Sequence, residues 1–151
     1  MTSANYEYFP NGGPKLEPIG VNDEGRTLWK LLDDFTYVSR TIMCFNIVVP
    51  KGYVTDLLSI PKGAWKVLPP FEFPALFGSI VHDIFYAGEI IPRKVADDIF
   101  LQAMIDAGED TWKAKTMYWS VRLFGGFTYS KHIPEEVERV RLMFKEKNKW
   151  L

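Results

Sequence analysis

Hydrophobic and polar positions follow two different patterns along the chain, and the change falls near Phe73. Before Phe73, short apolar runs are separated by Gly, Pro, Asn and Asp, which is typical of strands joined by turns. The runs predict strands at 15–21, 27–32, 35–39, 42–49 and 53–54. Turn-forming residues lie between them at 22–25 and 50–52, so this half is predicted to form a small antiparallel sheet.

After Phe73, apolar residues recur at the three- and four-residue spacing of helices. The spacing predicts four helices, at 74–87, 92–107, 110–124 and 134–148. Glycines follow the first three, at 88, 108 and 125–126, as expected of residues that end helices.

Strands followed by helices predict an α+β fold. Residues 1–72 are expected to be mostly strand and loop, and residues 73–151 mostly helical. Each half looks too small to bury a core alone, so residues 1–151 are predicted to form a single domain.

The 151 residues are 47% hydrophobic and 25% charged, which is the balance of a globular protein. The net charge of −1 gives no overall attraction to nucleic acid or to anionic membranes, so no nucleic-acid partner is expected. The N-terminus lacks a basic start followed by an apolar run, and no apolar segment approaches the roughly 18 residues that span a bilayer. We therefore expect a protein made in a cytoplasm, with no secretory signal and no transmembrane segment.

Cys44 is the single cysteine, which excludes an internal disulfide. It falls within the apolar run at 42–49, so we expect a buried and unreactive thiol.

Candidate chemistry lies on the first two predicted helices. His82 and Tyr86 are four residues apart and share one helix face, whereas Asp83 points about 100° further round. Asp97 occupies an otherwise apolar stripe of the next helix, which should face its neighbour. We expect Asp97 to hydrogen-bond to both His82 and Tyr86. Its carboxylate would orient the imidazole and leave the other ring nitrogen available as a base.

These residues also allow three other interpretations. His82 can be a polar residue kept only for structure, although burying Asp83 and Asp97 beside it would be costly for that purpose. A serine triad with Ser59 would lack the glycines that flank such a nucleophile. A zinc site would lack a ligand set, because His132 and Cys44 lie on distant segments.

Three strings carry a first resemblance: VPKGYVTDLLSIP at 49–61, HDIFY at 82–86 and RKVADDIF at 93–100. In this order they resemble a family of uncharacterised bacteriophage proteins, described as a domain of unknown function. The resemblance extends over about residues 29–124. It implies a phage or prophage origin, and hence synthesis in the cytoplasm of a bacterial host.

A second resemblance is local. The pattern His82-Asp-x-x-Tyr86, followed by Asp97-x-x-Phe, is similar to the paired catalytic helices of phospholipase A2, above all in its microbial branch. The resemblance implies that His82 is the general base that activates water, held in place by Asp97 and Tyr86. It also implies calcium as cofactor, bound by Asp83 and by the segment at 55–61, which contributes Asp56.

Two functions follow as expectations. The first is a virion- or tail-associated phage component whose His-Asp cluster is structural. Its partners are other virion proteins or a second copy of the chain, contacted through an aromatic surface that includes 65–74. The alternative is a calcium-assisted, phospholipase A2-like hydrolase acting on an ester in lipid or cell envelope. The sequence favours the first slightly, because the glycine-rich calcium loop of the enzyme is not recognisable.

Overall fold

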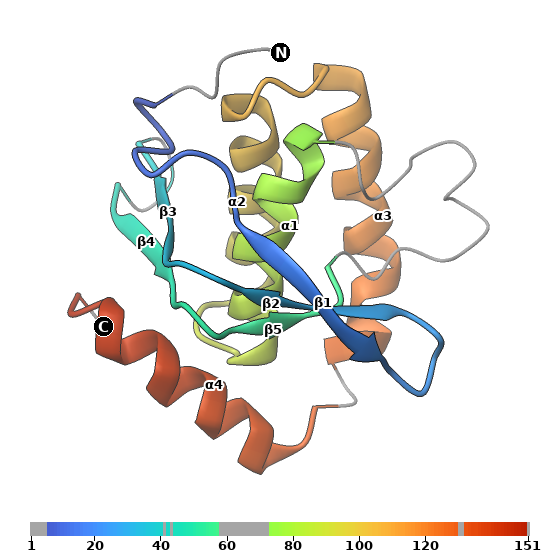
Figure 1. Ribbon diagram of the computed structural model, residues 1–151. Coiled ribbons are helices and arrows are strands. Elements are labelled where there is room, and N and C mark those ends of the chain that lie inside the picture. The colour runs from blue at the N-terminus through green and yellow to red at the C-terminus, as the bar shows by residue number, and fades with distance from the viewer. Residues whose placement is uncertain (1–5, 41, 43, 58–72, 130–131, 151) are drawn as a thin grey trace.

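A computed structural model describes residues 6–40, 42, 44–57, 73–129 and 132–150 (Figure 1). Within these ranges, short strands precede four helices, which confirms the α+β fold. The strands are β1 (Leu16–Val21), β2 (Thr27–Leu31), β3 (Phe35–Val38), β4 (Asn46–Val49) and β5 (Val54–Thr55). The helices are α1 (Phe73–Ala87), α2 (Arg93–Asp106), α3 (Thr111–Tyr129) and α4 (Pro134–Lys147).

The strands form two small antiparallel sheets where the sequence predicted one. β2 lies between β1 and β5, and β3 pairs separately with β4. The turn between β1 and β2 is held by the Asn22 side chain, which accepts hydrogen bonds from the backbone N–H groups of Glu24 and Arg26.

The predicted strand at 42–49 is too long at its start. Cys44 has a φ of 49°, in the left-handed region that an extended strand does not contain, and β4 begins at Asn46. The expectation of a buried thiol is therefore wrong. Cys44 is exposed, with its sulfur 3.1 Å from the carbonyl oxygen of Arg40.

The end predicted for the third helix is also wrong, because α3 continues through Gly125 and Gly126 to Tyr129. A Cβ atom on Gly125 would lie 3.0 Å from the hydroxyl oxygen of Tyr86. The glycine therefore allows a close approach between α3 and α1, and it does not end the helix.

α1 is the central element. It contacts the other three helices, β4 and β5, and Figure 1 shows it in the middle of the molecule with α3 and α4 at opposite edges. Ile80, Ile84 and Phe85 are fully buried, in one hydrophobic cluster that also contains Leu31 and Phe35 from the strands. Both halves of the chain thus contribute to the core that fixes α1. Within the described ranges, no helix is long and apolar enough to cross a membrane.

Candidate functional site

One carboxylate connects the residues that the sequence singled out. Asp97 of α2 is fully buried, and its Oδ1 lies 2.7 Å from Nε2 of His82 and 2.6 Å from the hydroxyl of Tyr86. Both partners come from α1, where their four-residue spacing places them one turn apart. The predicted hydrogen bonds of Asp97 to His82 and Tyr86 are confirmed.

Two arginines complete this network and join it to α3. Arg122 donates from Nη1 to Oδ2 of Asp97 over 2.8 Å. Arg93 donates from Nε to the Tyr86 hydroxyl over 3.0 Å, and its Nη2 donates to the backbone carbonyls of Val121 and Arg122. Neither arginine was predicted from the sequence as a site residue. The isolated Arg122 in an apolar stretch of α3 was a signal, because such a residue requires a buried acid nearby.

The protonation states within the network follow from these contacts. Burial would raise the pKa of Asp97, but the hydrogen bonds from His82, Tyr86 and Arg122 lower it below its ordinary value, so the carboxylate is ionised. Burial, together with the positive charge of Arg93, lowers the pKa of His82 below its ordinary value although Asp97 raises it, so the imidazole is neutral near pH 7. An ionised carboxylate can only accept a hydrogen bond, and therefore Nε2 of His82 carries the proton and Nδ1 keeps a free electron pair.

Nδ1 is the ring nitrogen of His82 that does not contact Asp97. The described hydrogen bond of His82 is made by Nε2. The side chain as a whole is 6% exposed, so the ring lies at the margin of the buried network.

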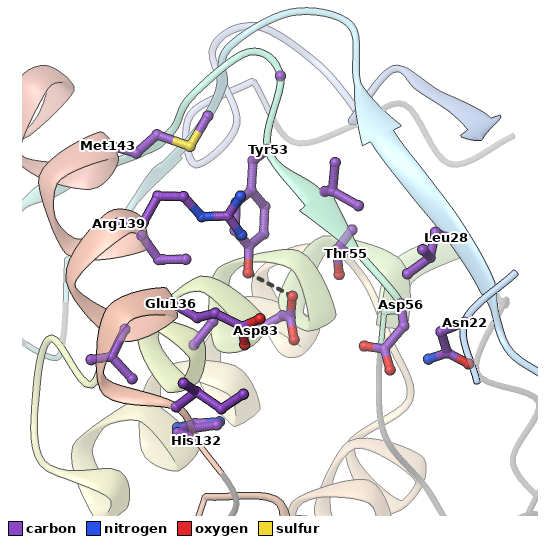
Figure 2. A pocket seen from close by; sticks show the side chains of 16 residues that line it. Asn22, Leu28, Tyr53, Thr55, Asp56, Asp83, His132, Glu136, Arg139 and Met143 are labelled. Carbon is purple, nitrogen blue, oxygen red and sulfur yellow. Dashed lines mark hydrogen bonds between the residues drawn. The ribbon is translucent and has the colours of Figure 1, made fainter. Parts of the chain in front are cut away.

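The next residue on α1, Asp83, points to a different place. It lines a cavity of about 540 Å³ between β5, α1 and α4, together with Tyr53 and Asp56. The Tyr53 hydroxyl donates to Oδ2 of Asp83 over 2.7 Å, which Figure 2 shows as a dashed line. In the same view Asp56 lies on one side of Asp83 and Glu136 of α4 on the other. His82 is not among the residues that line this cavity.

Asp83 is a weak acid in this position. Its pKa is raised to about 7, chiefly by burial and also by the negative charge of Asp56, and the hydrogen bonds from Tyr53 and Thr55 only partly oppose this. Burial also raises the pKa of Asp56, although the guanidinium of Arg26 opposes this from 3.6 Å.

The described residues do not complete a calcium site. Calcium takes six to eight oxygen ligands, and the predicted pair supplies two carboxylates, of which Asp56 is paired with Arg26 and Asp83 accepts from Tyr53. Within the described ranges, no cluster of three or more His, Cys, Asp and Glu side chains is arranged to hold a metal. Calcium binding by Asp83 and Asp56 stays a prediction.

Several other residues of the sequence hypotheses can now be placed. Ser59 and residues 65–72 lie outside the described residues. His132 lines the cavity near Asp83, with Nδ1 3.2 Å from a carboxylate oxygen of Glu89, and not near His82. Tyr53, the partner of Asp83, was not predicted as a site residue, because only the packing of β5 against α1 brings the two together.

Comparisons with known proteins place the chain in a family. Residues 29–121 match the family described as Protein of unknown function (DUF1353). The chain is also 31% identical over 106 residues to Uncharacterized protein y4jT of Sinorhizobium fredii. That alignment covers 70% of this chain and 31% of the relative, so the chain spans about a third of the relative's length. No solved structure matches the chain. With more than half of its residues matched, the chain belongs to the DUF1353 family of proteins of unknown function.

Proposed function

We propose that the protein is an ester hydrolase, acting on a lipid or cell-envelope substrate, with His82 as general base. One observation carries the proposal: a single oxygen of Asp97 accepts hydrogen bonds from both His82 Nε2 and the Tyr86 hydroxyl. This arrangement fixes the ring and its tautomer, as the resemblance to the paired helices of phospholipase A2 implies. It leaves Nδ1 of a neutral imidazole free to accept a proton.

In the proposed reaction, Nδ1 of His82 takes a proton from a water molecule while the water oxygen attacks the ester carbonyl carbon. The imidazolium that forms is stabilised by the ionised carboxylate of Asp97, which does not itself become protonated. The tetrahedral intermediate then collapses, the C–O bond to the alcohol breaks, and the proton on Nδ1 passes to the departing oxygen. The products are a carboxylic acid and an alcohol, and His82 returns to its neutral state.

Tyr86 and Arg122 act in this scheme as positioning residues. They hold the two oxygens of Asp97 at 2.6 Å and 2.8 Å, and so fix the carboxylate that orients His82. No step passes through calcium, because Asp83 and Asp56 alone do not provide its ligands.

The test is release of fatty acid from phospholipid vesicles, measured with calcium and with a chelator. His82→Gln should lower turnover by at least roughly a hundredfold, the usual effect of losing a general base. His132→Gln is the matched control, since His132 lies outside the network, and it should keep wild-type turnover. The absence of hydrolysis by the wild-type protein under every metal condition would overturn the proposal.

A second candidate function is favoured by a different observation. His82 is 6% exposed and Asp97 fully buried, and their network ties α1, α2 and α3 together. If the network is only structural, the protein is a virion- or tail-associated component of a phage, and the buried polar contacts help the chain to adopt a single fold. Its partners are then other virion proteins or a second copy of the chain. His82→Gln would leave Asp97 with one partner fewer and lower the free energy of unfolding by about 3 kcal/mol. Thermal unfolding of the variants used in the vesicle assay separates the two functions.

A further inference from the structure

The cavity beside Asp83 has the size and lining of a small-molecule site, and the His82 network does not use it. Its volume of about 540 Å³ falls within the range of roughly 300 to 1,000 Å³ that such sites occupy. Most of its wall is apolar, and the apolar residues include Leu28, Ala87, Ile133, Val137, Val140 and Met143. A ligand in the cavity would therefore bury an apolar body against α4 and the strands.

The polar groups of the cavity gather around one carboxylate. Figure 2 shows the Asp83 side chain between those of Asp56 and Glu136. The hydroxyls of Tyr53 and Thr55, two buried residues, are the donors to Asp83. An apolar wall with a few polar groups at one end is the arrangement that fixes the orientation of a bound small molecule.

Two of the three acids are matched by a cation of the protein, and Asp83 is not. Asp56 has the guanidinium of Arg26 at 3.6 Å. Glu136 has Arg139 three residues later on α4, at the spacing of neighbouring side chains on a helix. Among the described residues, the groups that act on Asp83 are two neutral hydroxyls and another acid. When Asp83 is ionised, the cavity therefore holds one negative charge that the described chain does not offset.

We propose that this cavity binds an organic ammonium ion, with the charged nitrogen beside Asp83 and an apolar body against α4 and Leu28. An ammonium group donates charge-assisted hydrogen bonds to carboxylate oxygens and supplies the positive charge that Asp83 lacks. A metal ion fits less well, because it would leave the apolar wall in contact with water. His82 does not line the cavity, so the inference is independent of the proposed hydrolysis.

The experiment is an NMR titration of the ¹⁵N-labelled full chain at pH 7.5 with three ligands of the same length. Hexylamine is charged, 1-hexanol is its neutral counterpart, and hexanoate has the opposite charge. We expect hexylamine to bind at least roughly tenfold more tightly than 1-hexanol, and hexanoate to bind more weakly than either. The backbone signals that move should include those of Thr55, Ala87 and Val137, which line the cavity.

Asp83→Asn should weaken the binding of hexylamine by roughly tenfold or more and leave that of 1-hexanol nearly unchanged, because only the charge is removed. Asp98→Asn is the matched control. It makes the same change on α2, at a carboxylate that pairs with Lys94 and does not line the cavity, and it should keep wild-type affinity. The ¹⁵N spectrum of each variant shows directly that it is folded.

Binding of hexylamine should also depend on pH. Asp83, with a pKa of about 7, is mostly ionised at pH 7.5 and mostly protonated at pH 6, whereas the amine stays charged at both. Affinity should therefore be about fivefold or more lower at pH 6. The other titratable groups that line the cavity are Tyr53, Asp56, His132, Glu136 and Arg139. The dependence should persist in His132→Gln and be absent from the residual binding of Asp83→Asn.

Phosphoethanolamine distinguishes two sources of the ammonium group. We expect it to bind more weakly than hexylamine, because it lacks an apolar body. Tighter binding would keep the ammonium site and assign it to a lipid headgroup, with the phosphate at Arg139. Equal affinities for hexylamine and 1-hexanol, tighter binding of hexanoate, or signals that move with calcium chloride and not with hexylamine would each overturn the inference. Hexylamine binding by a protein that hydrolyses no ester would defeat the proposed function alone.

Discussion

The carboxylates on the two sides of α1 have pKa values that are shifted in opposite directions. Asp97, which faces His82, is fully buried and yet has a pKa below its ordinary value. Asp83, which faces the cavity, is partly exposed and yet has a pKa raised to about 7. Burial acts on both carboxylates toward a higher pKa, so it does not explain by itself why the two shifts have opposite signs.

Donors and neighbouring charges explain the difference. Asp97 accepts from His82, Tyr86 and the cation of Arg122, whereas Asp83 accepts from Tyr53 and has Asp56 as an acidic neighbour. A carboxylate with three donors, one of them charged, is stable in its ionised form inside the protein. Asp83 has neutral donors only, the hydroxyls of Tyr53 and Thr55, and a like charge nearby, so it holds a proton more readily.

Removing Asp97 should have the largest effect on stability. Asp97→Ala leaves buried donors of His82 and Tyr86 without an acceptor, and we expect a loss of about 3 to 5 kcal/mol in the free energy of unfolding. Asp98→Ala is the matched control. Asp98, the next residue in sequence, pairs with the exposed Lys94 and accepts a hydrogen bond from Tyr118, so its removal should cost about 1 kcal/mol. Urea unfolding of both variants measures the difference, and equal midpoints would refute the structural part of the account.

Removing the charge of Asp83 should act in the opposite direction. Its pKa is about 7 in the folded protein against an ordinary value of 3.8, so the folded state holds the proton more tightly than the unfolded state. This contribution to stability is fully present below pH 4 and is lost as the pH rises through 7. Asp83→Asn keeps an acceptor for Tyr53 and cannot ionise, so it should be more stable than wild type at pH 8, by about 1 to 3 kcal/mol.

At pH 5 the advantage of Asp83→Asn should be about half of that at pH 8 or less, because the unfolded state is already ionised there, and below pH 4 it should disappear. Thermal unfolding at the two pH values provides the comparison. A variant that is destabilised equally at pH 5 and pH 8 would show that Asp83 is ionised in the folded protein.

Tyr86→Phe should have a moderate effect. It removes the hydrogen bond to Asp97 and the one received from Arg93, while His82 and Arg122 still hold the carboxylate. We expect a loss of about 1 to 2 kcal/mol in stability. In the hydrolysis assay the loss should appear in kcat, with KM nearly unchanged, because Tyr86 positions the base. An unchanged kcat would remove Tyr86 from the catalytic arrangement.

Alanine substitutions in the glycine pair of α3 should have the smallest effect on stability. An added Cβ at Gly125 would lie 3.0 Å from the Tyr86 hydroxyl, whereas one at Gly126 would have Arg93 at 3.5 Å as its nearest neighbour. Alanine is the better helix former, so Gly126→Ala should stabilise by up to about 1 kcal/mol. Gly125→Ala should be less stable than Gly126→Ala by about 1 kcal/mol, since Tyr86 must move. Equal melting temperatures would mean that the close approach at Gly125 has no energetic consequence.

Local geometry explains what the sequence could predict. Helical spacing places His82 and Tyr86 on one face and Asp97 on an apolar stripe. Because the two helices are joined by a short connection, the hydrogen bonds among these three residues could be predicted. Arg122 is 25 residues from Asp97 in the chain, and Tyr53 is 30 residues from Asp83. Contacts between residues so far apart in the sequence depend on how α3 and β5 pack, and the periodicity of the sequence does not specify that packing.

The predictions made for Gly125 and Cys44 were wrong for the same reason. Gly125 is commonly a residue that ends a helix, but here the space beside Tyr86 requires it within α3. Cys44 is commonly buried, but its left-handed backbone ends the strand and exposes the thiol. In both cases the tertiary environment overrides the usual preference of the residue type.

The assignment of His82 as a base depends on its protonation state, which NMR measures. The chain has two histidines, so ¹⁵N NMR of the imidazoles with His132→Gln as reference assigns both. The account predicts a neutral His82 at pH 7, protonated on Nε2 and unprotonated on Nδ1. Its pKa should lie below the ordinary 6.5, because burial and the charge of Arg93 together outweigh the effect of Asp97. A charged imidazole at pH 7, or a proton on Nδ1 in the neutral ring, would contradict the assignment of His82 as a base.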